Sequence, residues 1–510
     1  MRKLIIIPLS VKKIRRISKV CSFQYLMGDY LDSVRSFCSR GGGGARFCCT
    51  GPFSATPPGK RWVLAIVSAF FFVSLCISVF IYWNDVYDIA GNYFCWAPPP
   101  PSTSPRPAIK IDFPFNCSNR DPAITCPTSN QSVTSQTDNS SAVTCTQYTR
   151  WIQEDLRPWK TTGITRDMVD RARDFANFRV VIVKGKVYVE IYQNAYETRD
   201  VFTIWGIVQL LRLYPGKVPD LDLMFWCGDM PAILKREHNH VKHLPPVFHY
   251  CGDDKSYDIV FPDWSYWGWI EVNIKPWRSM REALKEGNNN TKWKDREPYA
   301  YWRGNPYVSR RRRELLKCNL SKKHEWNARL YGEDWGVERQ EGFKHSNLED
   351  QCTHRYKIYI EGVSWSVSEK YILACDSMTL LVDPKYYDFF TRSLVSKTHY
   401  WPIRTSHMCT DIKSAVDWGN DHTDKAQSIA ETASKFIQED LKMEFVYDYM
   451  FHLLSEYGKL FKYQPTIPPG AVEVCSETTL ACPGDGLWRK FMMDSMVTSP
   501  KATLPCTIPS

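Results

Sequence analysis

Asp229 is the strongest candidate for acid–base chemistry in this sequence. It lies in the segment FWCGDMP, directly after an apolar run over residues 221–227 that predicts a strand. Loops at the carboxyl ends of strands carry ligands in α/β proteins, and a carboxylate there can take a proton from a hydroxyl as a general base. A turn is the alternative role, because Gly-Asp near a proline favours one. Asp263 is the next loop carboxylate that could serve.

The other acidic pairs are considered as metal ligands. Asp220 and Asp222 have the Asp-x-Asp spacing that can hold a divalent cation, and their side chains would share one face of a strand. They stand at the entry of that strand, however, which is the opposite end from the expected site. Asp253 and Asp254 form a weaker, loop-like pair. The sequence therefore predicts no metal site.

Arginines at a strand end could bind a diphosphate. Arg303 and Gly304 end the predicted strand YAYWRG, and a run from Arg310 to Arg313 opens a helix. Guanidinium groups and free helix amides both bind phosphate oxygens. A solvated basic face is the alternative interpretation.

The segment HRYKIYIEGVSWSVSEKYILACDSMTLLVDP, residues 354–384, predicts a strand, a turn, a helix and a second strand. Gly362 permits close backbone approach, Ser366 offers a hydroxyl, and Lys370 adds a positive charge. Such a turn binds phosphate well. An ordinary crossover unit of an α/β sheet has the same pattern.

Two further patterns carry less weight. Glu361 and Glu369 have the spacing of the acid pairs in some retaining sugar transferases, but a first-turn helix position also explains Glu369. Trp264, Trp267 and Trp269 could stack on sugar rings on the acceptor side. Clustered tryptophans more often belong to a hydrophobic core.

The elements that must position these residues alternate between strand and helix. We expect a hairpin over residues 179–184 and 187–193, joined at Gly185. A buried helix is expected over residues 201–214, and five later strands are expected over residues 299–303, 326–331, 355–360, 378–382 and 399–403. This alternation predicts an α/β fold with largely parallel sheets. Long amphipathic helices over residues 424–441 and 444–463 could brace one domain against the other.

A membrane anchor precedes these elements. The run from Trp62 to Trp83 has 22 residues and no charge, which spans roughly 33 Å as a helix and is enough for a bilayer core. Basic residues before the span and Asp85 and Asp88 after it predict a cytosolic N-terminus and a luminal remainder. A Pro-rich and Ser/Thr-rich stalk follows.

The expected order along the chain has six parts. These are a basic cytosolic tail (1–61), a transmembrane signal anchor (62–83), a luminal stalk (84–145), an N-terminal α/β domain (146–290), a C-terminal α/β domain (291–465) and a C-terminal extension (466–510). The net charge of +10 comes from the tail, because acidic and basic residues balance in the remainder. This balance argues against a nucleic-acid-binding protein.

Glycosylation sequons and cysteines fit a secretory lumen. The sequons are centred on Asn116, Asn130, Asn139, Asn289 and Asn319. Of the 18 cysteines, 13 follow the span, and an oxidising compartment should pair some of them. We expect Cys475 and Cys482 to close a local loop and Cys375 to be a free core thiol.

Four long motifs, YAYWRGNP, HRYKIYIEG, WSVSEKYILACDSMTLLV and YYDFFTRSL…HYWPI, together resemble those of the Rumi-like protein O-glucosyltransferases. That family includes fungal capsule-associated xylosyltransferases, and the resemblance is closest to its plant branch of Golgi type II proteins. It covers residues 145–506. The family implies two Rossmann-like domains in the GT-B arrangement, an inverting mechanism, UDP-glucose or UDP-xylose as donor, and no required metal or other cofactor.

The resemblance also assigns roles by position. Asp229 falls at the family's catalytic aspartate, although Asp-Met-Pro replaces the usual Asp-Trp-Pro or Asp-Tyr-Pro. Arg303, Gly304, Arg311, Gly362, Ser366 and Lys370 fall at donor-binding positions. Ser368 stands where Rumi proper has an arginine facing the diphosphate, which leaves Lys370 or Arg311 to supply the charge.

The implied function is transfer of glucose or xylose to a hydroxyl of a protein or glycan acceptor. The last residues lack a Lys-Asp-Glu-Leu-like retrieval signal, which favours the Golgi membrane over the endoplasmic reticulum. The alternative is a membrane-anchored glycan-binding or scaffold protein that has lost catalysis and uses its tryptophans. A pure binder would need neither Asp229 nor a cationic donor loop.

The single span predicts a type II topology that proteolysis can check. Because the positive charge lies before Trp62, protease added to sealed vesicles should remove only the N-terminal tail and leave the stalk and both domains intact. Digestion of the stalk with protection of the tail would show the opposite orientation.

Overall fold

The computed structural model describes residues 114–115, 117, 121–127, 143–238, 241–482 and 486–508. The predicted membrane span, the stalk sequons Asn116, Asn130 and Asn139, and the tail lie outside these ranges. Within them, no helix is both long enough and apolar enough to cross a bilayer.

The C-terminal sheet has five strands, all parallel, in the order β10-β9-β8-β6-β7. They are β6 (Glu297–Gly304), β7 (Ala328–Gly332), β8 (His354–Tyr359), β9 (Met378–Val382) and β10 (Trp401–Ile403). All five strands predicted for this half are confirmed. Numbered along the chain, the order is 2-1-3-4-5, the doubly wound pattern whose ligand site lies where the order reverses. That switch point falls between β6 and β8.

The N-terminal sheet is mixed, in the order β11-β2-β1-β3-β4-β5. Its strands are β1 (Phe178–Val183), β2 (Lys186–Ile191), β3 (Leu221–Phe225), β4 (Phe248–His249), β5 (Ile259–Val260) and β11 (Val472–Val474). Only β3, β4 and β5 are parallel neighbours. The predicted hairpin is confirmed, and Lys184 and Gly185 at its turn both have positive φ. The expectation of a second Rossmann-like domain holds for the three parallel strands alone, because this hairpin and β11 pair antiparallel.

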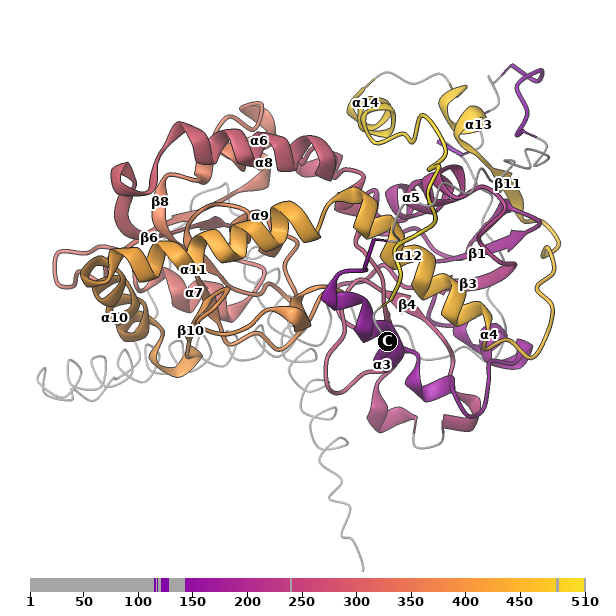
Figure 1. Cartoon of the computed structure of the whole chain (residues 1–510), viewed down its shortest axis with the longest axis horizontal. Coiled ribbons are helices and arrows are strands. Elements are labelled where there is room, and N and C mark those ends of the chain that lie inside the picture. The colour runs from indigo at the N-terminus through magenta and orange to yellow at the C-terminus, as the bar shows by residue number, and fades with distance from the viewer. Residues whose placement is uncertain are drawn as a thin grey trace, which may run out of the picture. The chain divides into compact units, whose positions relative to one another are not determined.

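Helices cover both sheets and join them. They are α3 (Trp151–Asp155), α4 (Arg166–Ala172), α5 (Arg199–Leu213), α6 (Trp277–Asn290), α7 (Arg310–Leu316), α8 (Trp335–Gln340), α9 (Glu369–Leu373), α10 (Met408–Asp421), α11 (Thr423–Lys435), α12 (Met443–Gly458), α13 (Ser476–Leu480) and α14 (Leu487–Asp494). α11 packs on β9, whereas α12 packs on α3 and α5. A π-helical turn over Phe436–Asp440 links them, so this run crosses from one sheet to the other (Figure 1).

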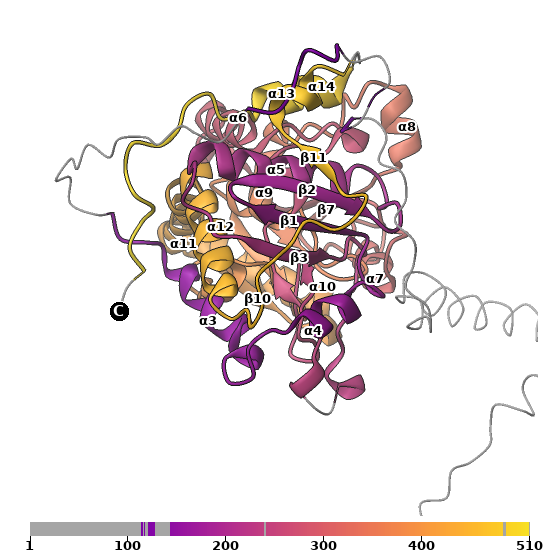
Figure 2. The same ribbon diagram turned by 90° about the vertical axis from the view of Figure 1, so that its right-hand side faces the viewer.

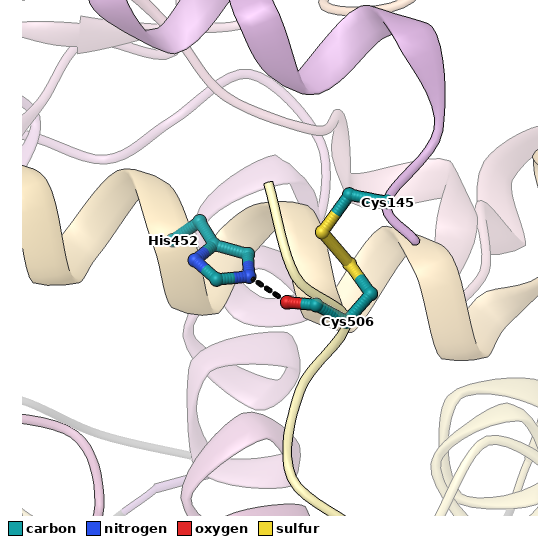
Figure 3. Close-up of side chains that lie close together, drawn as sticks. All are labelled: Cys145, His452 and Cys506. Atoms are coloured by element: carbon teal, nitrogen blue, oxygen red, sulfur yellow. Dashed lines mark hydrogen bonds between the residues drawn. A yellow bond between two sulfur atoms is a disulfide. The ribbon is translucent and has the colours of Figure 1, made fainter. Parts of the chain in front are cut away.

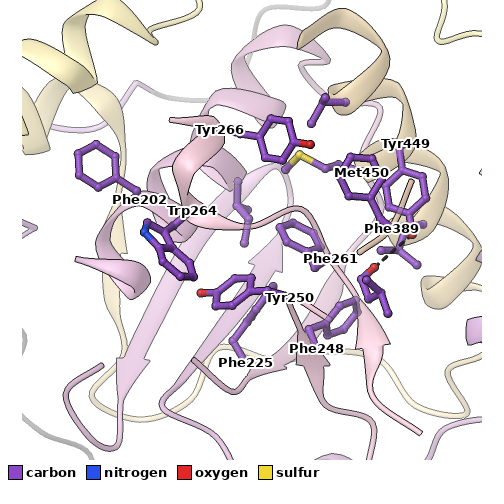
Figure 4. Close-up of a cluster of buried hydrophobic side chains, with 14 of the residues drawn as sticks. Phe202, Phe225, Phe248, Tyr250, Phe261, Trp264, Tyr266, Phe389, Tyr449 and Met450 are labelled. Atoms are coloured by element: carbon purple, nitrogen blue, oxygen red, sulfur yellow. Dashed lines mark hydrogen bonds between the residues drawn. The ribbon is translucent and has the colours of Figure 1, made fainter. Parts of the chain in front are cut away.

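An aromatic core anchors the N-terminal sheet (Figure 4). Phe225, Phe248 and Phe261 come from β3, β4 and the end of β5, and their ring centroids lie 5.1–6.1 Å apart. Tyr449 of α12 donates a hydrogen bond to the carbonyl of Val260. The last third of the chain therefore completes the N-terminal domain.

Disulfides tie the first described segments to the C-terminal extension. The bonds are Cys117–Cys482, Cys126–Cys475 and Cys145–Cys506, with Cys318–Cys409 and Cys352–Cys375 in the C-terminal domain. The predicted Cys475–Cys482 loop and the predicted free thiol of Cys375 are both wrong. For Cys475 and Cys482, the reason is that β11 of the extension pairs with β2 (Figure 2) and both cysteines bond to the first described segments. Cys375, just after α9, bonds to Cys352 instead. Cys227 and Cys251 are the free cysteines of the described residues, and both are buried.

The two described sequons differ in their surroundings. Asn289 is exposed near the end of α6. Asn319 is half-buried, and its side-chain amide bonds to both the carbonyl and the amide of Leu330. Its amide nitrogen is therefore already used in holding α7 against β7.

A buried ion pair joins the two domains. Nζ of Lys370, on α9, lies 3.0 Å from Oδ2 of Asp263, which follows β5, and both side chains are at most 1% exposed. Asp388 is a third carboxyl group of this cluster, and it is mostly uncharged at neutral pH because burial and then Asp263 raise its pKa to about 8. The expectation that Lys370 binds the donor is thus corrected, since its ammonium group is committed to Asp263.

A close backbone contact supports the same interface. Gly252 and Tyr387 form an antiparallel bridge with two hydrogen bonds of 3.0 and 2.9 Å. A Cβ on Gly252 would lie 2.7 Å from the ring of Tyr387, so the approach requires glycine.

Lys370→Met should destabilise the protein rather than weaken donor binding. It leaves the Asp263 carboxylate buried without a counter-charge, which costs about 3–5 kcal/mol in the free energy of unfolding. The charge of Asp263 outweighs burial and raises the pKa of Lys370. The contribution is therefore present throughout neutral pH and is lost only in strong alkali.

Urea denaturation and UDP titration check this together. Lys317→Met is the matched control, because Lys317 is 68% exposed in its pair with Glu314 and should change stability by less than about 0.5 kcal/mol. A Lys370→Met protein with native stability and weakened UDP binding would contradict the structural assignment.

Candidate functional site

Loops from both domains meet at the carboxyl ends of their strands. Asp229 lies in the loop after β3, and its backbone carbonyl accepts a hydrogen bond from the hydroxyl of Ser364, in the loop after β8. The hydroxyl of Tyr386, in the loop after β9, lies 3.4 Å from Sδ of Met230 in the Asp229 loop. The switch point of the C-terminal sheet therefore faces the loop that carries Asp229.

The Asp229 loop is held at several points. The Trp226 indole donates to the carbonyl of Met230 at 2.8 Å, and the Cys227 amide donates to the side chain of Asn177 at 2.8 Å. Nε2 of the buried His249 lies 2.8 Å from the carbonyl of Gly228. The backbone on both sides of the carboxylate is thus fixed before any substrate binds.

Arg199 is the functional partner of Asp229 that sequence reasoning missed. Its Nη1 lies 2.9 Å from Oδ1 of Asp229 and 3.0 Å from the carbonyl of Cys227. The side chain of Arg199 is 7% exposed and that of Asp229 is 26% exposed. The ion pair engages Oδ1 of Asp229 and holds the carboxylate in place. The available signal was an arginine in the first turn of a buried helix, where a cation opposes the helix dipole.

The predicted donor cations lie around the switch point and are already paired. Arg303, at the end of β6, lies 3.1 Å from Glu333 and 3.0 Å from Glu338. Arg311, on α7, lies 2.6 Å from Glu361 and donates to Thr405 at 3.0 Å. The side chains of Arg303 and Arg311 are 17% and 19% exposed, so each is partly open to solvent.

Arg312, which belongs to the predicted basic run of residues 310–313, has a structural role. It donates to the carbonyls of Ile360 and Glu361 and to the hydroxyl of Ser366 at 3.0 Å. Burial lowers its pKa to about 10. Arg312 therefore holds the loop after β8 against the start of α7, and the hydroxyl of Ser368 joins this network 2.9 Å from that of Ser366.

The predicted glycines occupy the same region. A Cβ on Gly304 would meet the ring of Trp302 at 3.0 Å, so side chains larger than hydrogen are disfavoured there. A Cβ on Gly362 would meet nothing closer than 3.6 Å. The space around residue 362 would therefore accept a side chain larger than that of glycine.

The glutamate pair has structural surroundings. The carboxylate of Glu361 accepts hydrogen bonds from the amides of Lys385 and Tyr386 as well as from Arg311. Glu369 is buried, which raises its pKa to about 8. These contacts fit a loop anchor and a neutral helix residue.

Two of the three predicted acceptor-side tryptophans belong to the core. Trp264 is 1% exposed and Trp267 is fully buried against Gly206. Only Trp269 is half-buried, and its indole donates to Glu197 at 2.7 Å. The tryptophan prediction is therefore wrong for Trp264 and Trp267, because α5 covers them.

The acidic pair before β3 is structural. Asp222 accepts two hydrogen bonds from Arg179 at 2.7 and 2.6 Å, and Asp220 accepts one from the backbone of Lys184 at 2.7 Å. Among the described residues, Cys145, His452 and Cys506 form a compact group of metal-ligand types. The two cysteines are joined in a disulfide, and His452 lies 2.7 Å from the carbonyl of Cys506 (Figure 3). Disulfide sulfurs are not thiolate ligands, so this group does not hold a metal.

Comparisons with known proteins agree with the geometry. The chain is 26% identical over 398 residues to the O-glucosyltransferase rumi homolog of Aedes aegypti, covering 74% of this chain and 93% of that protein. It is 26% identical over 343 residues to protein O-glucosyltransferase 1 of Homo sapiens, covering 64% of this chain and 83% of that protein. It is 25% identical over 339 residues to O-glucosyltransferase rumi of Drosophila melanogaster, covering 63% and 78%.

The family model described as glycosyl transferase family 90 matches residues 140–510. This range contains both sheets and every residue of the site described above. The chain belongs to glycosyl transferase family 90.

Proposed function

We propose that this protein is an inverting glycosyltransferase that moves glucose or xylose from a UDP-sugar to an acceptor hydroxyl. The observation that carries the proposal is the placement of Asp229. Its carboxylate is partly exposed and held by Arg199, and its loop contacts the loop after β8 at the switch point. A base on one domain thus faces a candidate nucleotide site on the other.

The chemical step uses the free oxygen of Asp229. The acceptor hydroxyl gives its proton to Oδ2 while its oxygen attacks C1 of the sugar from the face opposite the nucleotide. The bond between C1 and the diphosphate oxygen breaks, and UDP leaves with the electron pair. The proton then passes from Asp229 to solvent.

The leaving diphosphate carries the developing negative charge. Arg303 at the end of β6 and Arg311 on α7 have partly exposed side chains, and each would exchange a carboxylate partner for a phosphate oxygen. The hydroxyls of Ser366 and Ser368 lie in the adjoining loop. No cofactor and no divalent cation enters this scheme.

The compartment is also part of the proposal. Five disulfides fit an oxidising lumen. Together with the 22-residue apolar run before them, they support a single-pass type II protein of the Golgi membrane, with the catalytic part in the lumen.

Asp229→Asn should abolish most turnover and preserve the fold. The amide is nearly isosteric, but it cannot accept the hydroxyl proton, so kcat should fall by about 10²–10⁴-fold. UDP affinity should stay near that of the natural protein, because the proposed nucleotide site lies on the other domain. Asp254→Asn, at an exposed loop carboxylate, is the matched control.

The assay measures UDP release with each UDP-sugar, with and without acceptors, in the presence of EDTA. Full activity of Asp229→Asn would show that another residue acts as the base. No UDP release by the natural protein under any condition would favour a glycan-binding protein without catalysis.

A further inference from the structure

Tyr196 is an exposed aromatic side chain next to the candidate base. It lies in the loop before α5 and is 50% exposed. The guanidinium carbon of Arg199 lies 5.2 Å from the centre of its ring. The guanidinium of Arg199 thus packs against the ring of Tyr196, and half of the residue stays open to solvent.

One guanidinium holds both Tyr196 and Asp229. Arg199 binds Oδ1 of Asp229 at 2.9 Å. It also lies 4.6 Å from the ring of the buried Trp264, which fixes its position within the core. Cation–π contacts of this kind stabilise a partly desolvated arginine. The separation between the exposed ring and the carboxylate is therefore set by the fold.

Two carboxylates lie in or beside the loop that carries Tyr196. Glu197 adopts a left-handed backbone conformation, with φ of 57°, that turns its carboxylate to accept the indole N–H of Trp269 at 2.7 Å. Such a conformation in a residue other than glycine is strained and is often found at functional sites. Glu271 accepts from the hydroxyl of Thr198 at 2.9 Å.

Helix α8 of the C-terminal domain contacts the segment that carries Glu271. Arg339 donates to the backbone carbonyl of Glu271 at 3.4 Å, and the preceding residue, Glu338, binds Arg303. A single turn of α8 thus links the proposed acceptor side to the proposed donor side.

We propose that Tyr196 is the platform on which a sugar ring of the acceptor stacks, with Glu197 and Glu271 accepting hydrogen bonds from its hydroxyls. This inference rests on the proposed function and deepens it, because it assigns a glycan as the acceptor. The C–H face of a pyranose packs on an aromatic ring, while carboxylates satisfy the hydroxyls at its edge. A hydroxyl of the stacked sugar then faces Oδ2 of Asp229.

A folded protein acceptor fits this surface less well. Stable protein–protein contacts bury on the order of 800 Å² per partner around an apolar centre. The exposed feature of this loop is the ring of Tyr196, with Glu197 beside it and Glu271 bonded to Thr198, a composition that suits a saccharide subsite.

The test compares Tyr196→Ala, Tyr196→Leu and Tyr196→Phe with the natural protein. The probes are methyl glycosides and oligosaccharides of defined structure and one folded epidermal-growth-factor-like domain. Tyr196→Ala should raise the acceptor KM about tenfold, with kcat and the slow release of UDP to water unchanged. Tyr196→Leu should behave like the alanine variant, and Tyr196→Phe should retain the natural KM.

The matched control is Tyr188→Ala, at a half-buried tyrosine on β2 in the same domain. Saturation-transfer NMR of the same glycosides measures binding independently of turnover. Glycoside binding that is lost in Tyr196→Ala, without turnover by the natural protein, supports the platform and refutes the proposed transferase. Turnover by the natural protein with an unchanged KM in Tyr196→Ala overturns the platform alone, as does activity restricted to the folded domain with no dependence on Tyr196.

Discussion

The buried ion pair between Lys370 and Asp263 is the contact on which the arrangement of the site depends. Each partner comes from a different domain, and neither can be separated from the other without leaving a charge in an apolar interior. The pair therefore favours one relative placement of the two sheets. That placement brings Ser364 to the carbonyl of Asp229 and aligns the two loop clusters. A buried pair of this kind adds little net stability compared with apolar side chains, but it favours one relative placement of the two domains.

Ion pairs between arginines and carboxylates recur throughout the candidate site. Arg303, Arg311 and Arg199 each bind a carboxylate in the absence of substrate. The paired state keeps the guanidiniums ordered and limits the charge that a desolvated cleft must carry. Under the proposed function, a diphosphate would compete with the carboxylates for Arg303 and Arg311, so donor binding would exchange one set of charge-assisted bonds for another.

Local sequence patterns were sufficient to predict much of the secondary structure, but they predicted few of the contacts between distant segments. The five parallel strands and the hairpin at Gly185 follow from periodicity and turn residues, which are local in sequence. The disulfides Cys126–Cys475 and Cys352–Cys375 join segments whose proximity depends on β11 and α9. The position of Asp229 after a strand was predictable, whereas its partner Arg199 required the tertiary structure. Lys370 illustrates the limit, since one positive charge on a helix suits a phosphate and a buried aspartate equally well.

Both ends of the described chain are fastened to the same domain. Cys145–Cys506 and the pairing of β11 with β2 close the N-terminal domain around the chain's beginning and end, and the C-terminal domain is an insertion between α6 and α12. A tensile load entering through either terminus is therefore carried by covalent sulfur bridges and one sheet. It bypasses the contact between Asp263 and Lys370. Force applied to the ends of the described chain would therefore load the N-terminal domain first and leave the relative placement of the two sheets unchanged.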